Sequence, residues 1–310
     1  MNKNDKHVET VGMLYTFFAF LMWAFLALYW NALQSVSSTE ILAHRICWAF
    51  VFMITILCLK KNKLSLFYAN FKTLIFTPRL LFLVICSSLA ISANWVIYIW
   101  AVNHERVVEA SLGLYITPLV SILFGMIFLK DRTNLLQIIA ISMAAFGVLI
   151  LTLKYGHVPW IALSLALTSG IYSLSKKFIH FDSVIGMTFE TLMVMPFALM
   201  YLIYLHGKGI SAFGAGPIHI TLLLIGAGVV TALPLIWFAE GAKRITLTMI
   251  GFFQYITPSV TFILGIFVFK ESVIFIQWIS FLFIWAALLV FTLSKTKLTT
   301  IVRISDKKEA

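Results

Sequence analysis

The chain has 310 residues, of which 61% are hydrophobic and only 11% are charged. Soluble domains carry about a quarter charged residues and roughly half apolar ones, so this composition excludes an ordinary soluble domain and predicts a bilayer as the solvent. The net charge of +11 would suit nucleic acid, but the basic residues lie in short breaks between apolar runs, where they orient a membrane protein rather than form a nucleic-acid groove.

Ten apolar runs long enough to cross a bilayer follow one another along the chain. They cover residues 11–33, 39–59, 79–102, 108–129, 134–153, 158–176, 183–205, 218–240, 246–269 and 274–294. None alternates strictly, so we predict an all-α integral membrane protein with ten transmembrane helices and no barrel strands. The first run is too long for a signal-peptide core and is expected to be a retained span.

Lysine and arginine are distributed unevenly over the breaks. If the N-terminus is cytoplasmic, 18 of the 23 fall on the cytoplasmic side, among them Lys176 and Lys177 at the end of the sixth run, and Arg45 alone lies within a span. The positive-inside rule therefore predicts that both tails, residues 1–10 and 295–310, are cytoplasmic.

A sequence repeat divides the chain in two. Residues 115–118, Tyr-Ile-Thr-Pro, recur unchanged at 255–258, and the offset of 140 also aligns Gly125 with Gly265, Lys130 with Lys270, Asp131 with Glu271 and Gln137 with Gln277. Self-similarity of this kind predicts two copies of one unit, residues 11–153 and 158–294. Each copy holds five spans, an odd number, so the second enters the membrane upside down. Inverted repeats of this kind are common among secondary transporters.

The repeated segment contains a proline in each copy, Pro118 and Pro258, near the middle of its span. A proline there frees a backbone carbonyl, which protein or cavity water must satisfy. Because each proline recurs with a tyrosine, Tyr115 and Tyr255, we favour a pair of kinked helices lining a central cavity over ordinary kinks.

The preceding span carries a polar amide, Asn94, with Trp95 and Tyr98 on its general face. A mid-span amide needs a partner and therefore faces the bundle interior or a cavity. These residues suit the wall of a site for an aromatic or amphipathic solute, and plain packing is an equal alternative. Trp23 in the first span and Tyr172 in the sixth are further candidates for the cavity wall.

Three ionisable residues, His44, Arg45 and Glu190, lie within apolar runs, where each is costly unless paired or hydrated. Arg45 and Glu190 match at an offset of 145, which suggests an ion pair. Each lies about 10 Å from its own surface of a core about 30 Å thick, which leaves about 10 Å between their depths, so separate roles are the alternative. Glu190 is the candidate for proton or cation coupling, and Arg45 for an anionic substrate group or a structural anchor. His44 either titrates or is simply hydrogen-bonded.

Motifs of other function classes do not occur in the sequence. It contains no GxxxxGK[ST], HExxH, GxSxG or TVGYG segment, and its cysteines, Cys47, Cys58 and Cys86, lack CxxC or metal-like spacing. We therefore predict no metal, no cofactor and no catalytic residues. A membrane-embedded enzyme and a channel are the alternatives to a carrier.

Four segments carry a family resemblance. They are Leu28-Tyr29-Trp30, residues 40–45 (EILAHR), residues 94–101 (NWVIYIWA) and residues 109–116 (EASLGLYI). Together they resemble RarD-like members of the EamA family in the drug/metabolite transporter superfamily, over residues 11–294. The resemblance implies ten helices in two EamA-like repeats, a plasma-membrane location and export or exchange of small metabolites. The RarD name is associated with chloramphenicol sensitivity, which makes chloramphenicol a candidate substrate.

From the repeat and the resemblance we expect a secondary active transporter that works by alternating access. Its expected partners are a small-molecule substrate and the lipid bilayer. Protons are the candidate coupling ion, and a homodimer is the candidate assembly.

Overall fold

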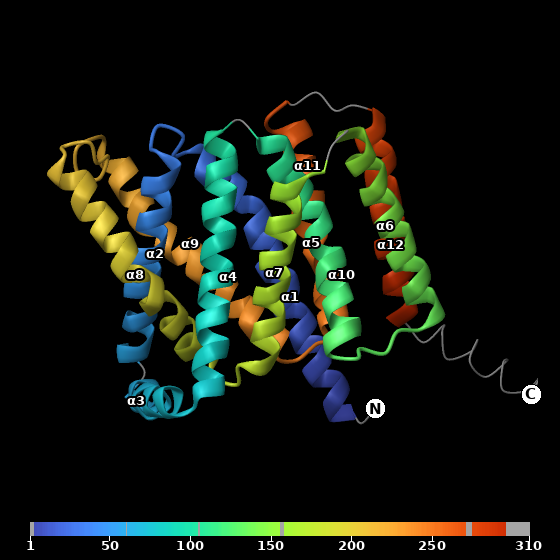
Figure 1. Ribbon diagram of the computed structural model, residues 1–310, viewed down its shortest axis with the longest axis horizontal. Coiled ribbons are helices and arrows are strands. Elements are labelled where there is room, and N and C mark those ends of the chain that lie inside the picture. Colours follow the sequence, from blue (N-terminus) through green and yellow to red (C-terminus); the bar gives the residue numbers. More distant parts are fainter. Residues whose placement is uncertain (1–2, 60, 105, 156–157, 271–274, 296–310) are drawn as a thin grey trace, which may run out of the picture.

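The computed structural model describes residues 3–59, 61–104, 106–155, 158–270 and 275–295, and all elements in these ranges are helices (Figure 1). Glu271 and all but the first residue of the predicted C-terminal tail lie outside them. The helices are α1 Lys3–Asn31, α2 Ser38–Leu59, α3 Lys61–Phe76, α4 Pro78–Asn103, α5 Val107–Phe128, α6 Leu135–Tyr155, α7 Trp160–Phe178, α8 Ser183–Gly207, α9 Ile218–Ala242, α10 Leu247–Gln254, α11 Ile256–Phe267 and α12 Phe275–Lys295.

Nine helical segments of the described chain are long and apolar enough to cross a membrane, with α10 and α11 together forming one of them. The expected all-helical membrane protein is therefore confirmed. The predicted sixth run coincides with α7, which has 19 residues and is less apolar than these nine because it carries several serines and ends in Lys176 and Lys177.

Two helical segments lie outside the predicted spans. The described part of the N-terminal tail, from Lys3, already belongs to α1, because no glycine or proline interrupts the sequence before Gly12. The helix α3 occupies the break between the second and third runs and lies across the lower ends of α2 and α4 (Figure 1). At 16 residues it is too short to span, and it leaves Tyr68 and Phe76 exposed, as an interfacial helix does.

The two proline helices differ from each other. The ninth span breaks at Tyr255 into α10 and α11, three residues before Pro258, whereas α5 runs continuously through Pro118. A proline removes one helical hydrogen bond in both cases. In α5 the Thr117 hydroxyl donates to the Gly113 carbonyl of the same helix at 2.7 Å. At the break, the Thr257 hydroxyl instead donates to the Phe20 carbonyl of α1 at 2.9 Å.

Helix packing follows a repeated scheme. The helix α7 packs on α4 and α5, and α1 packs on α9 and α11, while α6 lies along α12 at one side of the bundle (Figure 1). Close approach of α10 to α5 depends on Gly251, where an added Cβ would lie 2.7 Å from the Pro118 carbonyl oxygen. This packing surrounds the centre of the bundle with α1, α4, α5, α7, α9 and the α10–α11 break.

Candidate functional site

A cavity of about 330 Å³ lies among α1, α2, α4, α5, α7, α9 and the α10–α11 pair. Small-molecule sites commonly have volumes of about 300–1,000 Å³ and combine apolar walls with a few polar groups. The aromatic residues that line this cavity are Phe20, Trp23, Trp30, Trp95, Tyr98, Tyr172 and Phe238. Its other polar lining residues are Arg45, Asn94, Thr117, Ser169, Ser173, Thr231, Gln254, Thr257 and Thr261.

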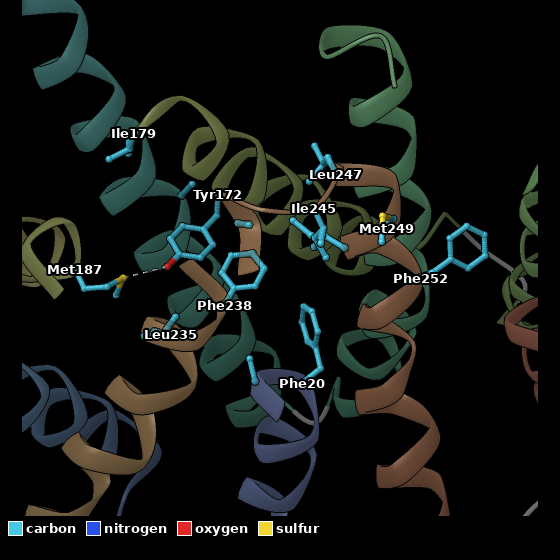
Figure 2. Packing of buried hydrophobic residues seen from close by; sticks show 14 of the residues in the cluster. Phe20, Tyr172, Ile179, Met187, Leu235, Phe238, Ile245, Leu247, Met249 and Phe252 are labelled. Carbon is cyan, nitrogen blue, oxygen red and sulfur yellow. Dashed lines mark hydrogen bonds between the residues drawn. The ribbon is translucent and has the colours of Figure 1, made fainter. Parts of the chain in front are cut away.

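Three of the aromatic rings that line the cavity contact one another. The ring of Phe238 stacks on Tyr172 and meets Phe20 edge-on, with 5.8 Å between centroids in both cases (Figure 2). The cavity extends away from these rings to Trp30, which lies in the last turn of α1. Along α1, Phe20 precedes Trp30 by ten residues, and α1 ends at the upper side of the bundle (Figure 1).

Polar contacts tie the helices together at the lower side. Lys177 donates to the carbonyls of Ala242 and Ile245, and Lys243 donates to the Ser183 hydroxyl at 2.7 Å. Burial lowers the pKa of Lys243, against the attraction of Glu240 and Asp182. These contacts join α7, α8 and the end of α9 beneath the aromatic rings.

Arg45 projects into the cavity from α2 and is partly exposed there. Its Nε donates to the Thr231 hydroxyl at 3.1 Å. Its guanidinium carbon lies 4.8 Å from the ring centroid of Trp30 and 5.0 Å from that of Trp95, within cation–π range. Among the described residues, no carboxylate lies within salt-bridge distance of this cation.

Asn94 connects the cavity wall to the next helix. Its side-chain amide nitrogen lies 2.9 Å from the Leu165 carbonyl and 3.0 Å from the hydroxyls of Thr168 and Ser169. The two amide protons are therefore shared among three acceptors of α7. Asn94 thus has its partner and also lines the cavity, where Trp95 and Tyr98 accompany it.

Glu190 is buried outside the cavity, with Lys176 as its partner. Its Oε1 accepts from Lys176 Nζ at 2.6 Å and from the Ser87 hydroxyl at 2.8 Å, while Oε2 has no hydrogen-bond partner. The structure therefore forms no direct pair between Glu190 and Arg45. Lys176 is only 4% exposed, which corrects its assignment to the cytoplasmic surface. Counting residues located the end of α7, but the long lysine side chain reaches back into the bundle.

A second, water-sized space of about 20 Å³ borders Glu190. Its walls include Ile91, Trp95 and Leu235, which also line the main cavity. On the other side, the Tyr172 ring lies 5.0 Å from the Lys176 ammonium and faces the main cavity. The buried ion pair is therefore separated from the cavity by single side chains.

Comparisons with known proteins place the chain among transporters. Residues 10–153 match the model of the EamA-like transporter family. The "Uncharacterized transporter YojE" of Bacillus subtilis is 47% identical over 94% of this chain and 97% of that protein. "Protein RarD" of Escherichia coli is 38% identical over 91% of this chain and 94% of that protein. The chain belongs to the EamA-like transporter family.

Membership of the EamA family confirms the resemblance drawn from the sequence, and membership of the drug/metabolite transporter superfamily follows. "Chloramphenicol-sensitive protein RarD" of Pseudomonas aeruginosa is a more distant relative, 27% identical over 84% of this chain and 86% of that protein. A crystal structure with 17% sequence identity superimposes with a TM-score of 0.72 over 92% of this chain and 98% of its own, so it shares the fold.

The repeated tyrosines of this EamA chain do not line the cavity. Tyr115 packs edge-on against Phe281, with 5.4 Å between centroids. Tyr255 is fully buried at the α10–α11 break, and its hydroxyl has no hydrogen-bond partner. Of the two prolines, Pro258 lines the cavity and Pro118 is buried elsewhere in the bundle.

His44 lies away from the cavity, although it is next to Arg45 in sequence. Its ring stacks on Phe213 at 4.9 Å, and its Nε2 lies 3.9 Å from a carboxylate oxygen of Glu40. Glu40 in turn accepts from the backbone N–H of Ala212 at 2.7 Å. These residues fasten the segment between α8 and α9 against α2 at the upper side.

Many cavity residues were not predicted as site residues from the sequence, among them Thr117, Thr257, Trp30 and Thr231. Thr117 and Thr257 occurred only within the repeated Tyr-Ile-Thr-Pro segment. Trp30 occurred only within a family segment, and Thr231 carried no separate signal. A systematic search for polar residues at mid-span would have found Thr231, because the functional groups of a membrane cavity must come from such positions.

Proposed function

We propose that this chain is a secondary active transporter that moves a small amphipathic or aromatic solute across the plasma membrane by alternating access, in the direction of export. The cavity is the observation that carries the proposal, because it lies between the two halves of the sequence and combines aromatic walls with dispersed polar groups. The chloramphenicol sensitivity in the name of the Pseudomonas relative supports an aromatic, drug-sized solute.

The proposed architecture is ten spans in two inverted repeats, residues 11–153 and 158–294, in which α7 is the sixth span and is added to the nine apolar segments. Lys130 and Lys270, at matching positions after α5 and α11, are the non-glycine residues with positive φ in the described chain, at 53° and 57°. The packing of α7 on α4 and α5 matches that of α1 on α9 and α11. Both observations support a pseudo-two-fold relation, which lets the halves exchange conformations during transport.

The proposed orientation places both termini in the cytoplasm. The uneven distribution of lysine and arginine supports it, even with Lys176 removed from the cytoplasmic count. In Figure 1, α1 begins and α12 ends at the same, lower side of the bundle. With this orientation the cavity faces the outside, and the aromatic rings with the contacts beneath them close the cytoplasmic side.

Protons are the proposed coupling ion, and the Lys176–Glu190 pair is the proposed site. A proton taken up by Glu190 would cancel its charge and leave Lys176 without a counter-charge in the bundle. Among the described residues, the titratable side chains that face Glu190 are Lys176 and Tyr172 of α7. Ser87 of α4 donates a hydrogen bond to Glu190. Ile46 of α2 and Leu235 of α9 line the second space beside it. Only single side chains separate the Lys176–Glu190 pair from the cavity, so a change in the protonation of Glu190 would affect solute binding there.

Counterflow in proteoliposomes tests the transporter. Vesicles preloaded with unlabelled chloramphenicol, or with members of an aromatic metabolite panel, should take up the labelled compound with saturable kinetics. Thr261→Phe should reduce this uptake, because Thr261 lines the cavity. Ile263→Phe on the same helix is the matched control, since Ile263 is 43% exposed on the outer surface. Unitary currents in planar bilayers, without saturable exchange, would instead identify a channel.

A further inference from the structure

The cavity holds an arginine whose charge no described carboxylate balances. Arg45 is the only charged residue that lines it, since no lysine, histidine, aspartate or glutamate of the described chain does so. The other charged groups buried in the bundle centre, Lys176 and Glu190, compensate each other. An uncompensated charge in a membrane interior is costly. A structural anchor role for Arg45 would not require its charge to face an open space.

The donors of Arg45 are incompletely used. A guanidinium has five N–H donors, and the described residues accept only from Nε, through Thr231. The four N–H groups on the two terminal nitrogens have no described protein acceptor. Those nitrogens form the planar fork that binds a carboxylate through two parallel hydrogen bonds. The indoles of Trp30 and Trp95 hold the fork, at 4.8 and 5.0 Å from its carbon.

We infer that the cavity binds a monoanionic organic acid, with its carboxylate on Arg45 and its aromatic or flat apolar part against the aromatic walls. This inference rests on the proposed transport function and specifies its substrate class. A single cationic residue matches a single carboxylate. The aromatic residues Trp23, Tyr172 and Phe238 line the same space and suit a planar group.

The cavity also discriminates against a positive charge on the substrate. No described carboxylate lines it, so an ammonium group would meet no counter-charge and would be repelled by Arg45. The site therefore selects acids that lack an amine over amino acids and over cationic amines. Selection of this kind comes from one repulsive element as well as one attractive element.

Three compounds with the same ring test the inference directly. Phenylacetate, phenylacetamide and phenethylamine carry charges of about −1, 0 and +1 at neutral pH. Binding to purified protein in nanodiscs is measured by quenching of tryptophan fluorescence, because Trp23, Trp30 and Trp95 line the cavity, and by thermal shift. We expect saturable binding of phenylacetate, affinity for the amide weaker by about tenfold or more, and no binding of the amine.

Substitutions at Arg45 and Thr231 separate the effect of the charge of Arg45 on binding from the effect of its shape. Arg45→Gln should remove the preference for phenylacetate over phenylacetamide. Arg45→Lys should retain part of it, because a lysine keeps the charge but loses the fork. Thr231→Val, which removes the Nε acceptor and keeps the cation, should retain most of it. A folding defect would show in the melting transition of the unliganded variants.

Equal affinities for the acid and the amide, or no binding of phenylacetate, would overturn the inference. Different results would contradict the transport proposal. Phenylacetate binding that depends on Arg45, without any counterflow, would support the anion site and contradict the transporter. Counterflow of neutral solutes that is unchanged in Arg45→Gln, combined with no acid preference in the wild type, would remove the anion site and leave the transporter.

Discussion

Arg45 and Glu190 occupy matching sequence positions in the two halves of the chain, yet their surroundings are opposite. Arg45 faces the cavity between two indoles and has no described counter-charge. Glu190 is 2% exposed and bonded to Lys176 and Ser87. A compensated pair persists without a ligand, whereas an uncompensated charge is relieved by water or a bound anion. The two halves thus place charged residues of opposite sign at matching positions, and we propose that one serves the solute and the other serves coupling.

The largest expected effect is loss of coupling in Glu190→Gln. Glutamine keeps the size and acceptor of the side chain but cannot exchange a proton, so the pH dependence of transport in proteoliposomes should disappear while counterflow at equal pH continues. Glu240→Gln is the control, because Glu240 is paired with Arg244 at the lower side and lies apart from the proposed coupling site. If the pH dependence of Glu190→Gln equals that of the wild type, Glu190 has no part in coupling.

Lys176→Met tests whether the buried charges of Lys176 and Glu190 stabilise each other. Methionine retains much of the apolar stem but leaves the Glu190 carboxylate buried alone, which should lower the free energy of unfolding by about 3–5 kcal/mol. The double variant Lys176→Met/Glu190→Leu removes both charges and should recover most of this loss. Unfolding in nanodiscs measures both. Equal destabilisation of the single and double variants would mean that packing, and not the ion pair, determines stability here.

Arg45→Gln should change the free energy of unfolding in the opposite direction to Lys176→Met. Removing a charge that has no described counter-charge relieves its desolvation, so the unliganded protein should become more stable. The expected gain is only about 1–3 kcal/mol, because the cation is already partly exposed in the cavity. The melting temperature without ligand measures this gain. A clear destabilisation would show that Arg45 is a structural anchor, and the contrast with Lys176 would then disappear.

The sequence predicted the helical architecture better than it predicted which side chains contact one another. Hydropathy located the helices, because each bilayer span must satisfy its own backbone hydrogen bonds and therefore appears as a long apolar run. At Pro258 the sequence predicted only a kink, but the helix breaks at Tyr255, whereas the identical Tyr-Ile-Thr-Pro segment stays helical in α5. The difference comes from tertiary contacts, such as the bond of Thr257 to the Phe20 carbonyl, which a local segment does not encode.

The candidate site was predictable only in part. Intramembrane charge singled out Arg45 and Glu190 because such residues are rare and costly. It missed Lys176, since a lysine at a helix end is ordinarily placed at the surface, and only the position of Glu190 on the neighbouring helix turns it inward. It also missed Thr231, because a threonine in a span is usually satisfied by its own helix, whereas this one accepts from Arg45 of the neighbouring helix α2.

Thr231→Val should have the smallest effect of these substitutions. It deletes one hydrogen bond to the guanidinium and should raise the dissociation constant for phenylacetate by a few-fold, equivalent to about 0.5–1.5 kcal/mol, through looser positioning of the fork. Thr261→Val is the control, because Thr261 lines the same cavity but makes no described hydrogen bond with Arg45. Isothermal titration in nanodiscs measures both. If both valines weaken binding equally, the loss reflects cavity polarity in general. If only Thr231→Val does, the orientation of Arg45 matters to the bound anion as well as its charge.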